Sequence, residues 1–424
     1  MVEYIRVRIK HAITKSISGT VADSGVVTLP SQPPKGALIV SIVPGTEAPI
    51  YIGRLIGSSA ISLKLNLTAP SGNLELRSAD SGIIPIGTYA EFQLINTNTE
   101  TLGGSYKQEA DIDLMGNAGL SVPDWEPIGT STAAFTGNFD GDGKNIKRLY
   151  INVNDPTDTS IENLGLFGYA GGSFSLSNVH IASGSVTGYY SYISGLLGRA
   201  NSDTLGTITG CSNSATIAGG SLVGGIVGKA VNVEISNCYN TGTVNAAENV
   251  SSTAVGGVVG QLTGSGKIVA CYNTGNVTFQ YSEMIGGVAG SVTSEMIACY
   301  NSGDVTGLTA VGGVLGSDHG GGKITACYNT GNITGTNTAE EFSILSFGGN
   351  VKACYWQDGK CSSNNSVGWT GGTADVGKFT TFFTPDTNAN TGSAEWGTGL
   401  GGSGAYWKVG TTNGNSLPKL WYEK

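Results

Sequence analysis

Cysteine is the residue type with reactive chemistry that recurs most regularly in this chain. Six of the seven cysteines are separated by 27, 33, 28, 28 and 27 residues, at Cys211, Cys238, Cys271, Cys299, Cys327 and Cys354. Redox or metal chemistry calls for Cys-x-x-Cys spacing or a nearby histidine, and this column has neither. A buried thiol behaves as a small hydrophobic group, so we predict a row of structural thiols. Cys361 follows Cys354 by seven residues, which leaves a disulfide between these two open in a secreted protein.

Acidic residues form two groups that could bind a metal or act in catalysis. The run Asp140-Gly-Asp142-Gly-Lys-Asn145 begins like an EF-hand loop. Ile151 stands where that loop needs a bidentate glutamate, which favours a simple turn and leaves calcium binding at Asp140 and Asp142 open. The second group could supply the paired carboxylates of a glycoside hydrolase, but we favour turn hydrogen bonds for it. Its members are Asp111, Asp113, Asp124 and Glu126.

Other catalytic motifs are missing from the sequence. The three histidines are His11, His180 and His319, and none stands in an H-E-x-x-H zinc motif. His180 takes the position that tyrosine fills in later repeats. No nucleophile elbow, phosphate-binding loop or dinucleotide fingerprint occurs in a usable context. We therefore predict no catalytic residue, no metal site and no cofactor.

A sequence unit that is repeated along the chain carries most of these residues. Val255–Thr278 reads VGGVVGQLTGSGKIVACYNTGNVT, and similar units begin at Val223, Ile285 and Val311. Each unit has three short apolar runs separated by glycine or asparagine, which is typical of strands and turns. One unit cannot bury a core alone, whereas stacked units can. We predict an all-β fold, a right-handed parallel β-helix of about eight coils, with Val179 and Leu149 in the cysteine position of the early coils.

The repeat resembles a known family. The strand G-G-hydrophobic-hydrophobic-G followed by A-C-Y-N-T-G is similar to the GLUG repeat, and a similar lead-in precedes it at Tyr106–Leu114, Trp125–Gly129, Phe135–Gly141 and Gly165–Gly168. This resemblance spans roughly residues 86–424. It implies a bacterial surface protein of the kind found in Bacteroides-like organisms and often described as a cell-adhesion protein. Some metallopeptidases that cleave immunoglobulin A also carry the repeat, but their zinc motif is missing from this sequence.

Changes in pattern divide the chain into three parts. Residues 1–85 contain period-two runs such as Tyr4–Lys10 and Ile61–Leu67, which predict a small antiparallel β-sandwich. Residues 86–354 are assigned to the β-helix, with a helical turn near Thr88–Ile95 as its first cap. Residues 355–424 hold five of the six tryptophans. We predict that they form a C-terminal capping region whose aromatic residues close the last coil.

Charge and hydropathy limit the partners. The net charge of −9 and the low content of charged residues argue against nucleic acid or an anionic membrane as a partner. No apolar run reaches the length of a membrane span, and Met1–His11 lacks the apolar core of a signal peptide. The resemblance implies a precursor with a lipoprotein signal, and hence an extracellular protein anchored to the outer membrane through a lipidated N-terminus. We expect a monomer.

Two functions remain open from the sequence. The first is a non-catalytic, adhesin-like surface protein that binds a host protein or glycan through loops that differ from coil to coil. The predicted contact residues are aromatic: Tyr189, Tyr190, Tyr192, Phe279 and Tyr281. The alternative is a carbohydrate-active β-helix enzyme, either a polysaccharide lyase or a glycoside hydrolase.

Overall fold

The structure is a computed structural model that describes most of the repeat region. It covers residues 83–96, 99–115, 125–153, 162–189, 192–220, 222–246, 252–279, 282–308, 310–318, 321–335, 341–342, 344–347 and 350–361. It also covers residues 367–369, 374–379, 407–408, 417 and 419–423, and the backbone of seven strands between residues 4 and 77.

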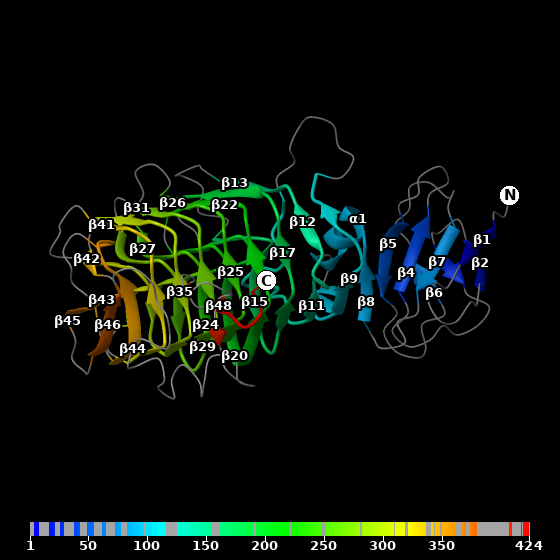
Figure 1. The fold of residues 1–424 in the computed structure, drawn as a ribbon. Helices are drawn as coiled ribbons and strands as arrows, with labels where there is room; N and C mark the ends of the chain where they lie inside the picture. The colour runs from blue at the N-terminus through cyan, green and yellow to red at the C-terminus, as the bar shows by residue number, and fades with distance from the viewer. Residues whose placement is uncertain are drawn as a thin grey trace.

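The first seven strands pair in antiparallel fashion. One four-stranded sheet has the order β1 (Tyr4–Val7), β2 (Ile17–Val21), β3 (Val26–Thr28) and β6 (Ser62–Lys64). A three-stranded sheet has the order β5 (Pro49–Arg54), β4 (Leu38–Ile42) and β7 (Asn73–Arg77). Figure 1 shows them beyond the first coil of the repeat region. The antiparallel pairing agrees with the period-two pattern, while the domain limits 1–85, 86–354 and 355–424 stay a prediction.

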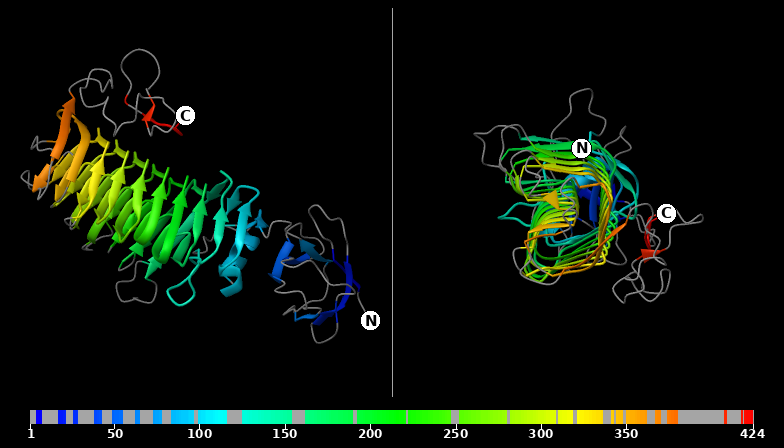
Figure 2. Two further views of the ribbon diagram at one scale, coloured as in Figure 1. Left: turned by 90° about the horizontal axis from the view of Figure 1, so that it is seen from below. Right: turned by 60° about the vertical axis from the view of Figure 1, so that its left-hand side comes forward.

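From β8 (Ile83–Ile86) onward, the chain is a parallel β-solenoid, seen along its side and near its axis in Figure 2. One seven-stranded sheet contains β13 (Leu149–Val153), β18 (Gly184–Gly188), β22 (Thr216–Gly219), β26 (Val244–Ala246), β31 (Val277–Phe279), β36 (Val305–Gly307) and β41 (Ile333–Gly335). Another contains β14 (Asn163–Leu164), β19 (Tyr192–Ile193), β23 (Leu222–Gly224), β27 (Ser252–Gly256), β32 (Ser282–Gly286), β37 (Val311–Gly312) and β42 (Glu341–Phe342). The predicted all-β solenoid is thus confirmed.

A third, 25-stranded sheet wraps the remaining sides of the coils. Its first side contains β15 (Phe167–Gly171), β20 (Leu197–Thr209), β24 (Val227–Ser236), β28 (Val259–Thr263), β33 (Ala289–Val292), β38 (Leu315–Ser317) and β43 (Leu345–Phe347). The next adds β16 (Ser175–Ser177), β29 (Lys267–Val269), β34 (Glu295–Ile297), β39 (Lys323–Thr325) and β44 (Asn350–Gln357). Short strands follow at β17 (His180–Ile181), β21 (Ser212–Asn213), β25 (Tyr239–Asn240), β30 (Tyr272–Asn273), β35 (Tyr300–Asn301) and β40 (Tyr328–Asn329).

The remaining elements lie at the two ends of the rod. The first coils contain β9 (Ser105–Gln108), β10 (Ile112–Asp113), β11 (Asn138–Asp140) and β12 (Asn145–Lys147), and the last ones β45 (Val367–Trp369) and β46 (Ala374–Phe379). The two seven-stranded sheets of the solenoid correspond to about seven turns, whereas the sequence predicted about eight coils. Leu149 pairs with Gly184, so it does not occupy the cysteine position that the sequence predicted for it. Val179 does, since His180 pairs with Ser212, the residue after Cys211.

A short helical segment lies at the start of the solenoid, where the sequence predicted one. It consists of α1 (Tyr89–Gln93), the 3-10 turn η1 (Leu94–Asn96) and α2 (Thr99–Leu102). Glu91 Oε2 accepts hydrogen bonds from the backbone N–H groups of Gly87 and Thr88, and Thr88 Oγ1 accepts one from Glu91 N–H. This is a capping box, and it fixes the helix start. Phe92 is fully buried and stacks on Trp125 at 5.2 Å, so the helix covers apolar residues of the first coils.

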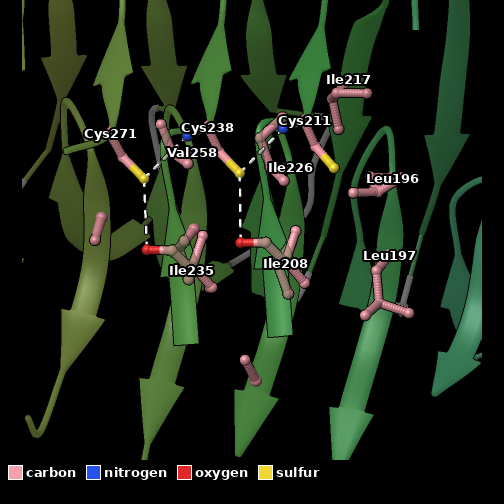
Figure 3. Close-up of a cluster of buried hydrophobic side chains, with 14 of the residues drawn as sticks. Leu196, Leu197, Ile208, Cys211, Ile217, Ile226, Ile235, Cys238, Val258 and Cys271 are labelled. Atoms are coloured by element: carbon pink, nitrogen blue, oxygen red, sulfur yellow. Dashed lines mark hydrogen bonds between the residues drawn. The ribbon is translucent and has the colours of Figure 1, made fainter. Parts of the chain in front are cut away.

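The cysteine column lies inside the coils, as predicted. Figure 3 shows Cys271, Cys238 and Cys211 side by side in successive coils, among apolar side chains. The backbone N–H of Cys238 donates to Sγ of Cys271 at 3.4 Å, and the Cys238 thiol donates to the Ser236 carbonyl at 3.2 Å. Cysteine therefore serves both as a small apolar group and as an acceptor for a buried N–H. Cys354 and Cys361 are both buried, and the disulfide that the sequence left open between them stays a prediction.

A second column, of asparagines, runs beside the cysteines. The side-chain amide of each asparagine donates to the side-chain oxygen of the next one, at 2.8 to 2.9 Å, along Asn213, Asn240, Asn273, Asn301 and Asn329. The same amide donates to the carbonyl two residues later, as Asn273 does to Gly275 at 2.7 Å. All five are fully buried. Because each side chain bonds to its copy in the next coil, the ladder fixes the register of the stack.

The glycine pair of the repeat is explained by this ladder. A Cβ added to Gly257 would lie 2.3 Å from Cγ of Asn273 and 2.2 Å from the carbonyl oxygen of Gly287. Gly287 stands in the same relation to Asn301. Two motifs that are separate in the sequence, G-G and C-Y-N, therefore pack against each other across the interior of one coil.

The asparagine ladder predicts a large effect of one truncation. In Asn273→Ala, the amide of Asn240 loses its acceptor and the oxygen of Asn301 loses its donor, both in a buried environment. We expect a loss of about 2–4 kcal/mol in the free energy of unfolding. Chemical denaturation followed by circular dichroism measures it. Thr274→Ala, one residue away and exposed, is the control, and an equal loss in both variants would contradict the role of the ladder.

Candidate binding site beside the tyrosine row

Two acidic residues considered as catalytic carboxylates, Asp111 and Asp113, are held in ion pairs. Asp111 lies 2.8 Å from the ammonium of Lys147 and accepts the backbone N–H of Asn145 at 2.9 Å. These hydrogen bonds, that of Lys147 first, lower the pKa of Asp111 to about 2. Asp113 forms a two-pronged pair with the guanidinium of Arg148, which likewise lowers its pKa. Glu126 is exposed; Asp124 lies outside the described residues. Asp111 and Asp113 thus join neighbouring coils at strand ends.

The run that begins like an EF-hand is a turn, as predicted. The backbone N–H of Asp142 donates to Asp140 Oδ1 at 3.0 Å, and Asp142 and Gly143 both have positive φ values, 50° and 69°. Asp142 pairs with Lys107 at 2.9 Å and with Lys144 at 3.2 Å. Within the described residues there is no group of three or more side chains placed to hold a metal ion.

The aromatic loop residues predicted as contacts have different environments. Tyr189 and Tyr192 are half-buried. Phe279 is only 1 % exposed and packs in the core, so its prediction as a surface contact is wrong. In β31, Val277 and Phe279 both point inward and Thr278 points outward, as strand alternation requires. Tyr190 and Tyr281 lie outside the described residues.

A row of stacked tyrosines runs along the outside of the solenoid. Tyr239, Tyr272, Tyr300 and Tyr328 follow the cysteines and pair in register. Their ring centroids are 4.8 to 4.9 Å apart and their planes within 4° of parallel. In-register parallel pairing places equal residues directly above each other, which produces this stack. His180 occupies the equivalent position two coils earlier, as predicted, and its Nδ1 is 2.7 Å from Ser212 Oγ.

The C-terminal residues pack against this row. The hairpin of β47 (Trp407–Lys408) and β48 (Lys419–Leu420) is drawn in red beside the solenoid in Figure 2. Trp407 lies 5.3 Å from the ring of Tyr328. Tyr422 stacks on Tyr272 at 6.3 Å and donates to the carbonyl of Ala270 at 2.7 Å. The expectation that the C-terminal aromatics close the last coil is therefore wrong for Trp407 and Trp421, which cover the flank.

A pocket of about 550 Å³ lies where the hairpin meets the uncovered part of the row. Tyr239 and Tyr272 line it from the solenoid, and Trp421, which is 55 % exposed, and Tyr422 line it from the C-terminal segment. The other lining residues are polar or small: Asn178, His180, Thr209, Gly210, Asn237 and Glu423. Aromatic faces together with amide, hydroxyl and carboxylate groups suit a ligand with apolar faces and many hydroxyls.

Burial favours the neutral forms of His180 and Tyr272 in the pocket and of the neighbouring Tyr300. Burial lowers the pKa of His180, which favours the uncharged imidazole at neutral pH. It raises the pKa of Tyr272 and Tyr300, and the Tyr300 hydroxyl donates to Glu423 Oε2 at 2.8 Å. Glu423 is the only carboxylate among the lining residues that the structure describes. The pocket therefore offers hydrogen-bonding groups with little net charge.

Sequence reasoning recognised the tyrosine position but read it as part of the scaffold. The pocket joins Tyr239 to Trp421, and no sequence pattern relates two residues so far apart in the chain. The available signal was the recurring tyrosine position itself, combined with the tryptophans near the C-terminus.

Three comparisons with known proteins place the chain in context. The family model described as the GLUG motif matches residues 219–245, which confirms the resemblance for that repeat. Halomucin of Haloquadratum walsbyi is 29% identical over an alignment of 194 residues, which covers 41% of this chain and 2% of that protein. The chain therefore spans a very small part of the length of this relative. A crystal structure described as "a putative immunoglobulin A1 protease" from Bacteroides ovatus has 20% identity and a TM-score of 0.48, covering 82% of this chain and 94% of that chain.

The tyrosine row predicts a distinctive alkaline titration. The pKa values of Tyr272, Tyr300 and Tyr328 are raised by burial above the ordinary value of about 10. The neutral phenols therefore stabilise the fold fully below that pH, and this stability is lost as the pH rises further. We expect the phenolate absorbance of the row to appear together with the loss of the β-sheet circular dichroism signal. Ionisation of these tyrosines in the intact fold would contradict their burial.

Proposed function

We propose that this protein is a non-catalytic, extracellular binding protein that recognises a glycan through the pocket beside the tyrosine row. The observation that carries the proposal is the pairing of Tyr239 and Tyr272 with the exposed Trp421 around one open pocket. The apolar face of a sugar ring packs on such aromatic surfaces, while its hydroxyls hydrogen-bond to amide and carboxylate groups. Asn178, Asn237 and Glu423 supply these groups.

The arrangement of carboxylates favours binding over catalysis. Glycoside hydrolases generally use two carboxyl groups on either side of the scissile bond. Among the described residues that line the pocket there is one, Glu423, which accepts a hydrogen bond from Tyr300. Asp111 and Asp113 are each held in an ion pair. A lyase or hydrolase remains the alternative function, and product analysis distinguishes it from binding.

The proposed location rests on the repeat and not on the pocket. The GLUG match and the resemblance of the neighbouring coils support an extracellular protein with an adhesin-like role on a cell surface, with a host glycan or protein as partner. Among the described residues, no helix is long and apolar enough to cross a membrane. Attachment through a lipidated N-terminus belongs to the same proposal and is tested by the mass of the cell-derived protein.

The pocket predicts which substitution weakens glycan binding. Trp421→Ala removes an exposed ring, so it changes the pocket without disturbing the core. We expect the affinity for a neutral glycan found on a glycan array to fall about five- to tenfold, the equivalent of roughly 1 kcal/mol or more. Isothermal titration calorimetry measures it, and Tyr239→Ala is expected to act in the same direction.

Leu205→Ala is the matched control, because Leu205 is also a large exposed apolar residue, at 47 %. Its affinity should equal that of the unmodified protein. Release of new reducing ends or unsaturated sugars from the bound glycan would contradict the non-catalytic part of the proposal. Equal binding by Trp421→Ala would contradict the pocket as the site.

A further inference from the structure

A column of four outward positions differs from the rest of the repeat. In-register pairing places Tyr169, Arg199, Lys229 and Gln261 next to each other on β15, β20, β24 and β28. All four are half-buried. The column thus brings two cations into neighbouring coils, about 4.8 Å apart along the solenoid.

Both cations also face an aromatic ring from the neighbouring sheet. The guanidinium carbon of Arg199 lies 5.0 Å from the ring centroid of Tyr192 and 5.6 Å from that of Tyr169. The ammonium of Lys229 lies 5.6 Å from the ring centroid of Tyr192. The three side chains therefore form one cluster, and its tyrosine is a residue that the sequence analysis selected as a contact.

The cluster has no counter-charge in the described part of the chain. The ion pairs there involve other lysines and arginines, and none includes Arg199 or Lys229. Nε of Arg199 is buried and has no hydrogen-bond acceptor among the described residues. Like charges on directly neighbouring strands destabilise a sheet. Burial and the charge of Arg199 accordingly lower the pKa of Lys229.

Other cations on the solenoid surface are paired with carboxylates from neighbouring coils. On the adjoining side of the solenoid, Lys267 lies 3.5 Å from Glu234, and Lys323 lies 3.7 Å from Glu295. Each pair joins residues in register on adjacent coils. Opposite charges therefore alternate along that side. The Arg199–Lys229 pair breaks the pattern, which points to an external anion as its partner.

We propose that Arg199, Lys229 and Tyr192 form an anion-binding site for an acidic saccharide that bears carboxylate or sulfate groups. Arg199 offers a planar fork of donors that matches either oxyanion, and Lys229 adds a second charge. The rings of Tyr169 and Tyr192 and the amide of Gln261 provide contacts for the sugar beside its anionic group. The saccharide part rests on the proposed glycan-binding function, whereas the anion site is independent of the pocket at Trp421.

The overall negative charge does not prevent such binding. The chain carries a net charge of −9, but the Debye length at physiological ionic strength is about 8 Å. Charges beyond that distance are largely screened, while a cation pair in direct contact with the ligand is not. The local pair therefore determines the sign of the interaction.

The test compares four polymers and two double variants. The polymers are polygalacturonate, dextran sulfate, unmodified dextran and polyglutamate, and binding is measured by biolayer interferometry at several salt concentrations. In R199Q/K229Q, we expect affinity for polygalacturonate or dextran sulfate to fall about tenfold or more. The control K267Q/K323Q makes the same change in net charge by removing two ion-paired lysines. Its affinity should stay within about twofold, because both lysines are already paired with glutamates and lie outside the cluster.

The outcomes separate this inference from the proposed function. Preference between the first two polymers identifies the anionic group. Equal losses in both double variants would overturn the site, and binding of polyglutamate equal to that of polygalacturonate would overturn the saccharide assignment. Failure of the neutral glycan to respond to Trp421→Ala would instead affect the pocket alone. R199Q/K229Q should unfold at the same or a higher temperature, because it removes a like-charge repulsion, and this excludes misfolding as the cause of a lost affinity.

Discussion

The buried asparagine ladder is the interaction that fixes the rest of the solenoid. A backbone ladder of parallel strands is almost indifferent to a shift of register, because every residue offers the same N–H and C=O groups. The amide-to-amide bond from Asn240 to Asn273 is not indifferent, since a shift would leave both amides unpaired in the interior. An unpaired buried polar group costs more than a hydrogen bond contributes, so the ladder acts mainly by excluding other registers.

This fixed register determines which chemistry appears on each side of a coil. Cysteine, tyrosine and asparagine are consecutive in the repeat, so the ladder that holds Asn273 inside also places Cys271 in the core and stacks Tyr272 on the outside. Regular rows of this kind stabilise the scaffold, because stacked identical side chains cover one another. Ligand-binding sites can form where such a row is interrupted. The pocket lies at such a place, where Ser212 separates His180 from Tyr239 and the C-terminal hairpin covers only the later rings.

The sequence was sufficient for features that repeat, and insufficient for features that occur once. The solenoid, the thiol column and the position of His180 all follow from comparing copies of one unit. Phe279 was misjudged because a loop and a strand end look alike in sequence, and only the alternation in β31 shows that it points inward. The contact of Trp407 with Tyr328 depends on a hairpin that returns along the rod, and residues so distant in the chain carry no common pattern.

The same reasoning explains why a repeat protein can acquire a charged site without changing its fold. In an in-register stack, a substitution at one outward position places the new side chain beside the equivalent residue of the next coil. Two substitutions in neighbouring copies are therefore enough to create a pair, as Arg199 and Lys229 do where later coils have Gln261 and Ser291. The interior rows are unaffected, because outward and inward positions are separate. Comparing the residues at each equivalent outward position of the repeats is thus the most direct way to predict the binding surfaces of such a protein.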